Sequence, residues 1–108
     1  MKNQDWQSLP LINNDSAAKK RFELHIEGEI AFIEYIQAKN SIIYLTHTEV
    51  PKTLEGRGLG ATIVSKTLHY INEKGFKMAP LCPFVAAYLK RHPKEADGIL
   101  APGYSIGL

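Results

Sequence analysis

The amino-acid sequence predicts an α+β (mixed α/β) protein built around one central, mostly antiparallel sheet. Between residues 21 and 50, apolar and polar residues alternate over several short segments, a pattern typical of strands with one exposed face. In two later segments the apolar residues recur every three or four positions, which is typical of amphipathic helices. Because a short apolar segment separates the two helices, we expect a strand-helix-strand-helix unit to follow an antiparallel meander.

The length and composition limit the protein to a few classes. A chain of 108 residues forms one domain, and its 13 basic and 11 acidic residues are interleaved without a basic block. We therefore expect no nucleic-acid partner, because binding to a phosphate backbone needs clustered positive charge. The apolar runs are too short to span a bilayer, and the polar stretch Met1–Asn14 does not resemble a signal peptide. The single cysteine, Cys82, has no disulfide partner and no zinc-ligand spacing around it, so we expect a cytoplasmic protein with no metal and no membrane contact.

The sequence predicts secondary structure least clearly at the two ends of the chain. Residues 1–20 are expected to form an N-terminal extension, in which Leu9–Ile12 is a candidate short edge strand followed by a turn at residues 13–15. The domain itself is expected to span residues 21–95. Residues 96–108 have three apolar residues between two glycines and a proline, so we expect an irregular C-terminal tail.

Three strands are predicted in the first half of the domain. The first, over residues 21–27, alternates apolar and polar side chains and ends at a turn around Gly28. The second, Glu29–Gln37, is richer in apolar and aromatic residues and is expected to be more buried. The third, Ser41–Val50, is rich in β-branched residues and ends at Pro51.

Two helices and one strand are predicted in the second half. From Gly58 the apolar residues fall at helical spacing, and Gly75 is well placed as the C-terminal cap. The short apolar segment Phe76–Leu81 is expected to be a strand. A second helix is predicted over Pro83–Arg91 and ends there because the residue before Pro93 disfavours helix.

Three glycines within five residues, Gly56, Gly58 and Gly60, lie between the third predicted strand and the first helix. The first N–H groups of a helix lack partners inside it, and the helix dipole adds partial positive charge there. Glycines also let the backbone approach a bulky anion closely. The loop is therefore a candidate diphosphate site, to which Lys52 and Arg57 could add positive charge. The alternative is a connector that only begins a helix.

Two other nucleotide-binding loops fit the sequence less well. Residues 60–67 nearly match the pattern GxxxxGK[ST], but Ser65 replaces the second glycine and the segment lies inside the predicted helix. The dinucleotide pattern GxGxxG fails because Ala61 and Ile63 stand where a third glycine would belong. We reject both patterns.

The order Arg57-Gly58-Leu59-Gly60, after a strand and at the start of a helix, resembles the acyl-CoA pyrophosphate loop of GNAT-superfamily N-acyltransferases, usually written Q/R-x-x-G-x-G/A. Gly58 and Gly60 take the two glycine positions, whereas Glu55 stands at the Gln or Arg position and departs from the pattern. Over residues 21–95 the chain resembles the small, single-domain branch of that superfamily. Four segments carry this closer resemblance: His47–Pro51, Leu54–Gly58, Pro80–Val85 and Arg91–Pro93.

The resemblance implies a minimal GNAT-like fold and an N-acetyltransferase that uses acetyl-CoA as co-substrate. It implies that the glycine-rich loop holds the pyrophosphate and that residues 47–50 lie along the pantetheine arm. Larger members surround the acceptor with helices and strands that this chain is too short to contain. We therefore expect an open site for an amine of unknown identity, on a small molecule or a protein. The expected acetyl-CoA contacts are Thr48, Val50, Glu55, Gly56, Arg57, Gly58, Leu59, Gly60 and Ala61.

Cys82 is the candidate nucleophile. It precedes the second predicted helix, whose first residue would be Pro83, a favoured position for proline. The dipole and unpaired N–H groups of a helix N-terminus stabilise a thiolate, and a thiolate beside a thioester can accept its acyl group. The resemblance to the small branch implies the same role for this cysteine. The alternatives are a residue that lines the thioester without reacting and a small, buried core residue.

Direct transfer to an amine needs a group that takes the ammonium proton. His47 and Glu49 lie two residues apart on one face of the third predicted strand and are the candidate catalytic bases, although either could be an ordinary strand residue. His92, before a proline, and Tyr88, one turn after Phe84, are expected to be structural. Two other functions stay open: a non-catalytic acyl-CoA-binding module that acts through a protein partner, and a structural domain with no ligand.

Overall fold

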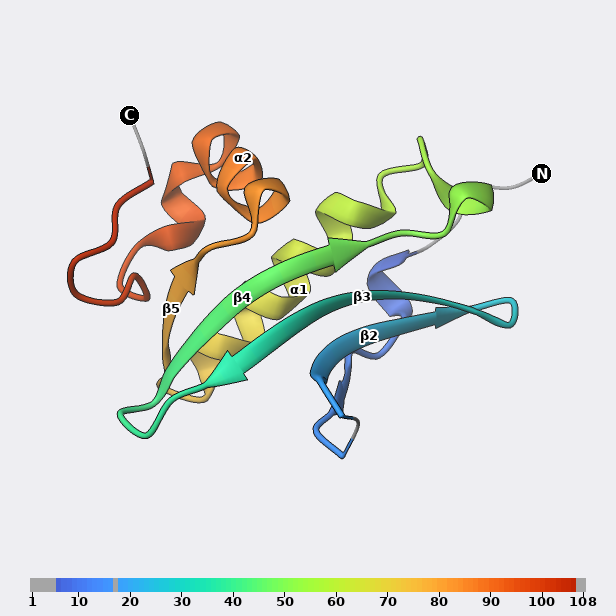
Figure 1. Cartoon of the computed structure of the whole chain (residues 1–108). Coiled ribbons are helices and arrows are strands. Elements are labelled where there is room, and N and C mark those ends of the chain that lie inside the picture. The colour runs from blue at the N-terminus through green and yellow to red at the C-terminus, as the bar shows by residue number, and fades with distance from the viewer. Residues whose placement is uncertain (1–5, 17, 107–108) are drawn as a thin grey trace.

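The strands form one five-stranded sheet in a computed structural model of the chain, which describes residues 6–16 and 18–106. The strands lie side by side in the order in which they occur in the sequence, and only the last pair is parallel (Figure 1). The predicted mostly antiparallel sheet is therefore confirmed. The strands are β1 (Ile12–Asn14), β2 (Lys20–Ile26), β3 (Glu29–Gln37), β4 (Ile42–Glu49) and β5 (Lys77–Pro80).

Two α-helices and three short 3₁₀ helices complete the described fold. They are η1 (Trp6–Ser8), η2 (Lys52–Leu54), α1 (Leu59–Glu73), α2 (Pro83–Arg91) and η3 (Pro93–Ala96). The end of α1 confirms the predicted glycine cap: Gly75 has a left-handed φ of 76°, and its amide donates to the Asn72 carbonyl. The next amide, of Phe76, donates to the Ile71 carbonyl, which completes a Schellman motif. Among the helices that the structure describes, none has the length and apolarity needed to cross a bilayer.

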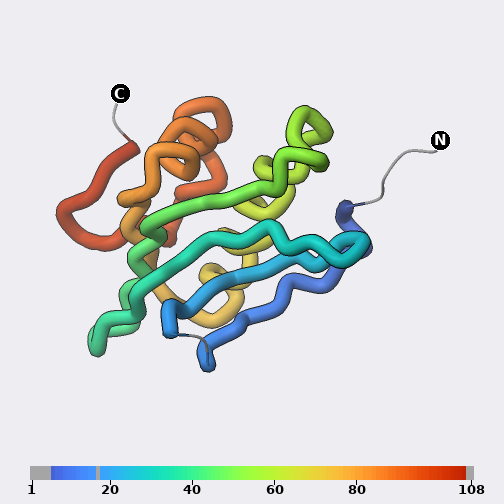
Figure 2. Tube along the Cα trace, turned by 45° about the vertical axis from the view of Figure 1, so that its right-hand side comes forward, coloured from blue at the N-terminus to red at the C-terminus, as the bar shows by residue number. Residues whose placement is uncertain are grey.

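The main core lies between one face of the sheet and the two helices. α1 runs along that face, and α2 packs beside the end of β5 (Figures 1 and 2). Side chains from every layer are fully buried in this core, for example Phe22 and Ile33 from the sheet, Ile63 from α1 and Leu89 from α2. The helical spacing in the sequence therefore corresponds to a buried helix face, as predicted.

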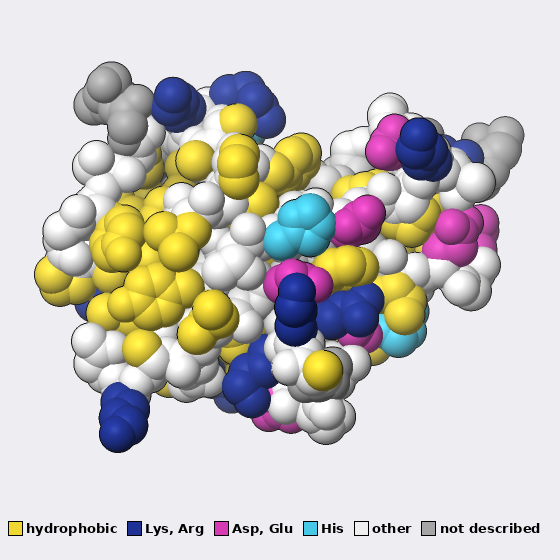
Figure 3. Space-filling model, viewed as in Figure 1, with side chains coloured by type: hydrophobic (Ala, Val, Ile, Leu, Met, Phe, Trp, Pro, Cys, Tyr) yellow, Lys and Arg dark blue, Asp and Glu magenta, His cyan; other side chains and the backbone are white. Residues whose placement is uncertain are grey.

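No helix of the described residues covers the opposite face of the sheet, which we call the open face. At the β5 side, a small second cluster of Ile42, Ala79 and Ala101 lets the C-terminal segment pack against the sheet. Figure 3 shows charged and histidine side chains gathered over the middle of the molecule and apolar ones toward the β5 side. The open face therefore combines a polar centre with an apolar margin.

A β-bulge in the ladder between β3 and β4 reverses the side-chain alternation of β4. The extra residue is Thr46, whose hydroxyl donates a hydrogen bond of 3.1 Å to the carbonyl of Glu34. Beyond the bulge, Thr48 pairs with the fully buried Ile33, and His47 pairs with Glu34. Because directly paired residues share a face, Thr48 faces α1 and His47 points to the open face.

β4 and β5 separate after four paired residues, the last of which are Leu45 and Pro80. The amide of Cys82 still donates a hydrogen bond of 2.8 Å to the Leu45 carbonyl. β4 then continues to Glu49, whereas the other chain turns into α2 (Figure 1). Past Leu45, this edge of β4 therefore has no strand partner in the described part of the chain.

Two expectations about the strands are wrong. The edge strand is Ile12–Asn14 rather than Leu9–Ile12, and the side chains of Asn13 and Asn14, expected in a turn, bond instead to Tyr35 and Glu23. The second predicted strand, β3, is not more buried than its neighbours, because it alternates between the core and the open face. Its residue Ile36 is 61% exposed there. The division of the chain at residues 20 and 95 stays a prediction.

Candidate functional site

The glycine-rich loop joins the end of β4 to the start of α1. Leu54, the last residue of η2, is 3% exposed and anchors the loop in the core. Gly56 and Gly58 have left-handed φ values of 82° and 81°, which other residues rarely adopt. Gly58 is the N-cap of α1, and no side chain caps the helix there. Two of the three glycines are therefore required by the backbone path.

The amides of this loop have no internal partners. Within the described residues, none of the N–H groups from Gly56 to Ala61 donates to a backbone carbonyl outside a regular element, and the first amides of α1 have no carbonyl one turn earlier. These N–H groups coincide with the positive end of a 15-residue helix. The loop thus has the donors and the field that bind phosphate groups in proteins.

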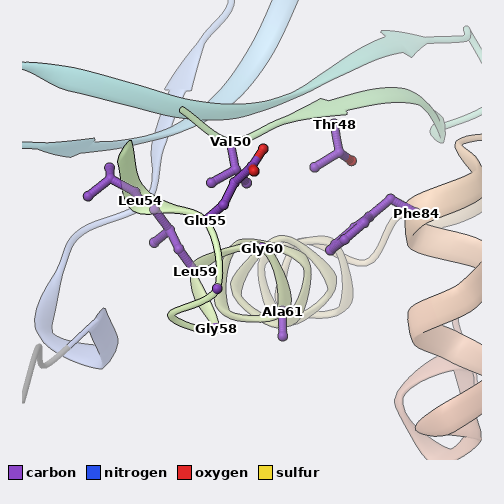
Figure 4. Close-up of a pocket in the computed structure, with 10 residues that line it drawn as sticks. Thr48, Val50, Leu54, Glu55, Gly58, Leu59, Gly60, Ala61 and Phe84 are labelled. Atoms are coloured by element: carbon purple, nitrogen blue, oxygen red, sulfur yellow. The ribbon is translucent and has the colours of Figure 1, made fainter. Parts of the chain in front are cut away.

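A cavity of about 440 Å³ lies between this loop and the end of β4, and its volume falls in the usual range for small-molecule sites. In Figure 4, Thr48 and Val50 lie on one side of it, the first turn of α1 on the other, and Phe84 points toward it from α2. Eight of the nine expected acetyl-CoA contacts line this cavity. The lining residues are Thr48, Val50, Leu54, Glu55, Gly56, Gly58, Leu59, Gly60, Ala61 and Phe84.

The ninth expected contact, Arg57, is exposed and does not line the cavity. Its carbonyl accepts a hydrogen bond of 2.9 Å from the indole N–H of Trp6. Lys52, in the first turn of η2, is also exposed. Neither positive side chain lines the cavity, so a role in binding an anion on the loop stays a prediction.

Phe84 is a lining residue that the sequence reasoning missed. Its ring packs against Gly60, so closely that a methyl group added to Gly60 would lie 2.6 Å from the ring. Phe84 is nevertheless 41% exposed. An apolar residue in the first turn of the second predicted helix, one turn before buried Tyr88, was the available signal. A side chain at position 60 would therefore have to displace the Phe84 ring, although this glycine has no left-handed backbone.

Glu55 brings a carboxylate to the same cavity. Figure 4 shows its side chain directed from the loop toward Val50 and Thr48. Glu55 is the residue that departs from the loop pattern, and no acidic residue lies in the first turn of α1. A bound diphosphate would therefore meet one nearby negative charge as well as the free amides.

Cys82 lies directly behind the wall of the cavity. It is the N-cap of α2, is 2% exposed, and does not line the cavity itself. Its sulfur is 3.2 Å from the hydroxyl oxygen of Thr48, which does line the cavity. The structure therefore brings Cys82 and Thr48 together across the point where β4 and β5 separate, with Thr48 between the thiol and the cavity.

His47 and Glu49 are not brought to the cavity. They form a pair on the open face, with 2.8 Å between His47 Nε2 and Glu49 Oε1, and both side chains are more than half exposed. Glu49 pairs across the ladder with Phe32, whose ring lies 6.4 Å from the His47 ring. The bulge at Thr46 is the reason, because it turns the odd-numbered side chains that follow it, His47 and Glu49, away from α1. The candidate residues of β4 therefore lie on both of its faces: Thr48 faces the cavity, whereas His47 and Glu49 lie on the open face.

Tyr88 lies on α2 and belongs to the core. It is 4% exposed, and its hydroxyl donates a hydrogen bond of 2.7 Å to Glu95 Oε2. Burial, followed by the hydrogen bond to the Glu95 carboxylate, raises the pKa of Tyr88 above its usual value. Its ring centroid lies 4.4 Å from that of His92, which is exposed. Both residues therefore hold η3 against α2, and neither lines the cavity.

Comparison with known proteins identifies a family and several relatives. The family model described as GCN5-related N-acetyl-transferase matches residues 21–98. The chain is also 26% identical over 89 residues to Protein NATD1 of Gallus gallus, covering 81% of each chain. Protein NATD1 of Homo sapiens is 26% identical over 89 residues as well, with 81% of this chain and 79% of the human protein covered.

Proposed function

Because this chain belongs to the GCN5-related N-acetyltransferase family, we propose that it transfers an acetyl group from acetyl-CoA to an amine. The observation that carries the proposal is the row of unpartnered backbone amides from Gly56 to Ala61 over a cavity of about 440 Å³. A loop of this kind binds a diphosphate through backbone N–H groups and the helix dipole. Members of the family typically use acetyl-CoA, whose diphosphate fits this chemistry.

The remaining lining residues fit the rest of the co-substrate. Thr48 lies on β4, which in the described part of the chain pairs with β5 only as far as Leu45, and Val50 follows the strand directly. We propose that a pantetheine arm lies along this edge, where backbone groups need partners. Phe84 and Leu54 offer apolar contacts to the same arm. An arm on this edge would lead from the loop toward Thr48 and bring the thioester next to Cys82.

Cys82 is our candidate for the acyl acceptor on the enzyme. Its thiolate would attack the thioester carbonyl carbon, the carbon–sulfur bond to coenzyme A would break, and the released thiolate would take up a proton. The amine would then attack the acetyl-cysteine, break its carbon–sulfur bond, and regenerate the thiolate. The Thr48 hydroxyl, 3.2 Å from the sulfur, would donate a hydrogen bond to the thiolate in both steps.

His47 and Glu49 are the candidate bases for the incoming amine. Their position on the open face fits an acceptor that approaches from the side opposite the glycine-rich loop. In this arrangement His47 would take the ammonium proton, and Glu49, 2.8 Å from its ring nitrogen, would stabilise the resulting imidazolium. An exposed pair suits an acceptor amine carried on a protein or on a small molecule.

One observation favours the alternative, an acyl-CoA-binding module without turnover that acts through a protein partner. Glu55 lines the cavity and would put a negative charge near a diphosphate bound on the loop, at the position where the superfamily pattern has Gln or Arg. A carboxylate there weakens binding without removing it, because the donors are backbone amides. In this alternative Cys82 would be a buried thiol with no chemistry.

The test is incubation with acetyl-CoA, with and without a panel of primary amines. Release of the coenzyme A thiol and the intact mass of the protein are both followed. We expect amine-dependent thiol release and, without amine, one acetyl adduct that Cys82→Ala abolishes. Normal amine turnover by Cys82→Ala would reject the covalent route and keep direct transfer. Saturable binding with no release for any amine would favour the binding module, and no binding at all would overturn both.

A matched pair of glycine variants tests the site itself. Gly58 and Gly103 both have left-handed φ values, of 81° and 88°, with open space where a side chain would point. Valine at either position introduces the same backbone strain. We expect Gly58→Val to lose acetyl-CoA binding and Gly103→Val to keep it. Equal binding by the two variants would contradict the site.

A further inference from the structure

The chain's single tryptophan contacts the glycine-rich loop from outside the cavity. Trp6 is 9% exposed, and its indole N–H donates a hydrogen bond of 2.9 Å to the carbonyl of Arg57. Its helix η1 packs against α1. Trp6 lies 15 positions before the residues that the family model matches, which begin at residue 21. The contact therefore belongs to the N-terminal segment of this chain and not to the matched part of the domain.

The bonded carbonyl lies in the middle of the glycine-rich loop. Arg57 stands between two left-handed glycines, Gly56 and Gly58, where little else restricts the rotation of the peptide units. A peptide unit is planar and trans, so the Arg57 carbonyl and the Gly58 N–H point in opposite directions. Trp6 does not line the cavity, whereas Gly58 does. A carbonyl held toward Trp6 therefore turns the Gly58 N–H away from Trp6.

We propose that Trp6 is a positioning residue of the co-substrate site, which holds the Arg57–Gly58 peptide so that the loop amides are ready to bind a diphosphate. This inference rests on the proposed function, because it assigns the N-terminal segment to that same site. Without the indole bond, the peptide between two glycines can rotate, and a diphosphate must order it on binding. Ordering a loop at the moment of binding lowers the affinity, whereas a preordered loop avoids that cost.

A second contact of the same segment provides a matched control. The ammonium group of Lys66, on α1, donates a hydrogen bond of 2.8 Å to the carbonyl of Gln7. This bond holds η1 to α1 but touches no residue of the glycine-rich loop. Lys66→Ala therefore removes one bond of the segment and leaves the indole bond in place. Trp6→Phe removes the bond to the loop and retains an aromatic ring in the core.

The experiment measures coenzyme A binding by isothermal titration calorimetry for the wild type, Trp6→Phe and Lys66→Ala, after circular dichroism has shown each to be folded. Loss of one hydrogen bond should raise the Kd about fivefold in Trp6→Phe. The Kd of Lys66→Ala should stay within twofold of the wild type, about the error of the method. In the ligand-free protein, amide hydrogen exchange at residues 56–61 should be faster in Trp6→Phe only.

An isosteric replacement keeps the test valid if Trp6→Phe does not fold. The chain has one tryptophan, so growth on 3-benzothienyl-alanine replaces Trp6 alone by a side chain of the same shape that lacks the N–H donor. The same weaker binding and faster exchange are expected. Wild-type affinity in this protein, or equal weakening in Lys66→Ala, would overturn the positioning role and leave the proposed function standing. Failure of the wild type to bind coenzyme A would overturn both.

Discussion

The hydroxyl of Thr48 and the thiol of Cys82 lie 3.2 Å apart, and this contact joins β4 to the N-cap of α2 where β4 and β5 separate. Among the residues that the structure describes, only Thr48 both lines the cavity and bonds the buried sulfur. A hydrogen bond from the hydroxyl stabilises a thiolate more than a thiol. The contact is therefore where binding and covalent chemistry would meet.

Thr48→Val tests this contact by removing the hydroxyl and keeping the shape of the side chain. We expect the free energy of unfolding to fall by about 1 kcal/mol, and formation of the acetyl adduct on Cys82 to slow about fivefold. Time-resolved intact mass measures the adduct. Thr46→Val is the matched control, because it removes a hydroxyl of the same strand that bonds the Glu34 carbonyl instead. Equal slowing in both variants would show that the bond to Cys82 has no special role.

Gly60 and Phe84 are predicted to be energetically coupled. A methyl group at position 60 would lie 2.6 Å from the ring, so Gly60→Ala should displace Phe84 and weaken acetyl-CoA binding. Alanine is the better helix former by about 1 kcal/mol, so the same substitution should stabilise a protein that already carries Phe84→Ala. A double-mutant cycle from urea unfolding should give a coupling energy of about 1 kcal/mol. Additive effects would contradict the contact.

Glu55→Gln restores an amide at the position where the superfamily pattern has Gln or Arg. Removal of a negative charge beside the diphosphate should strengthen coenzyme A binding, by about threefold at low salt and less at high salt. Calorimetry at two ionic strengths measures both effects. Glu73→Gln changes the net charge equally at the far end of α1 and should leave the affinity unchanged. Weaker binding by Glu55→Gln would mean that the carboxylate itself contacts the ligand.

Tryptophan fluorescence should report on the glycine-rich loop. The chain has one tryptophan, and its indole N–H bonds the carbonyl of Arg57. Binding of a diphosphate to this loop should change the emission of Trp6 in a saturable way, with the Kd found by calorimetry. The change should be absent in Gly58→Val and present in Gly103→Val. A titration in which calorimetry detects binding but the emission stays constant would contradict a site at this loop.

Stability at acid pH should depend on Glu23, which is only 3% exposed. Burial by itself raises the pKa of this carboxyl, but hydrogen bonds from His25 and Asn14 and the charge of Arg21 outweigh burial and lower it below its usual value. A lowered pKa in the folded state means that Glu23 stabilises the fold at pH values above the pKa that its carboxyl has in the unfolded chain. That contribution is lost as the pH falls through the folded pKa.

The comparison is between the wild type and Glu23→Gln in urea unfolding from pH 7 down to pH 3. The wild type should be the more stable protein at neutral pH, and the difference should shrink as the pH falls below about 4.5. A constant difference across this range would show that the carboxylate charge contributes nothing. Glu23 pairs with Phe32, and Phe32 pairs with Glu49, so Glu23 belongs to the open face. That face is therefore expected to contribute to stability, although no helix of the described chain covers it.

Local patterns predicted most of the fold. The helix over Pro83–Arg91 has the predicted bounds, and Gly75 caps α1 as expected, because helical spacing, proline and glycine act within one or two turns. The glycine-rich loop could likewise be located, since Gly56 and Gly58 are needed for a left-handed backbone. Where side-chain bonds to distant strands compete with local preference, as at Asn13 and Asn14, the sequence pattern was misleading.

The faces of β4 show what only the tertiary structure decided. In the sequence, His47 and Thr48 differ by one position, and nothing in the local pattern shows that Thr46 is a bulge. Pairing with β3 decides that Thr48 faces the cavity and His47 the open face, because register depends on contacts with a separate strand. For the same reason, the sequence of the glycine-rich loop does not show which distant residues contact it. The ring of Phe84 lies against Gly60, and the indole of Trp6 bonds a carbonyl 51 positions away, only once the chain has packed.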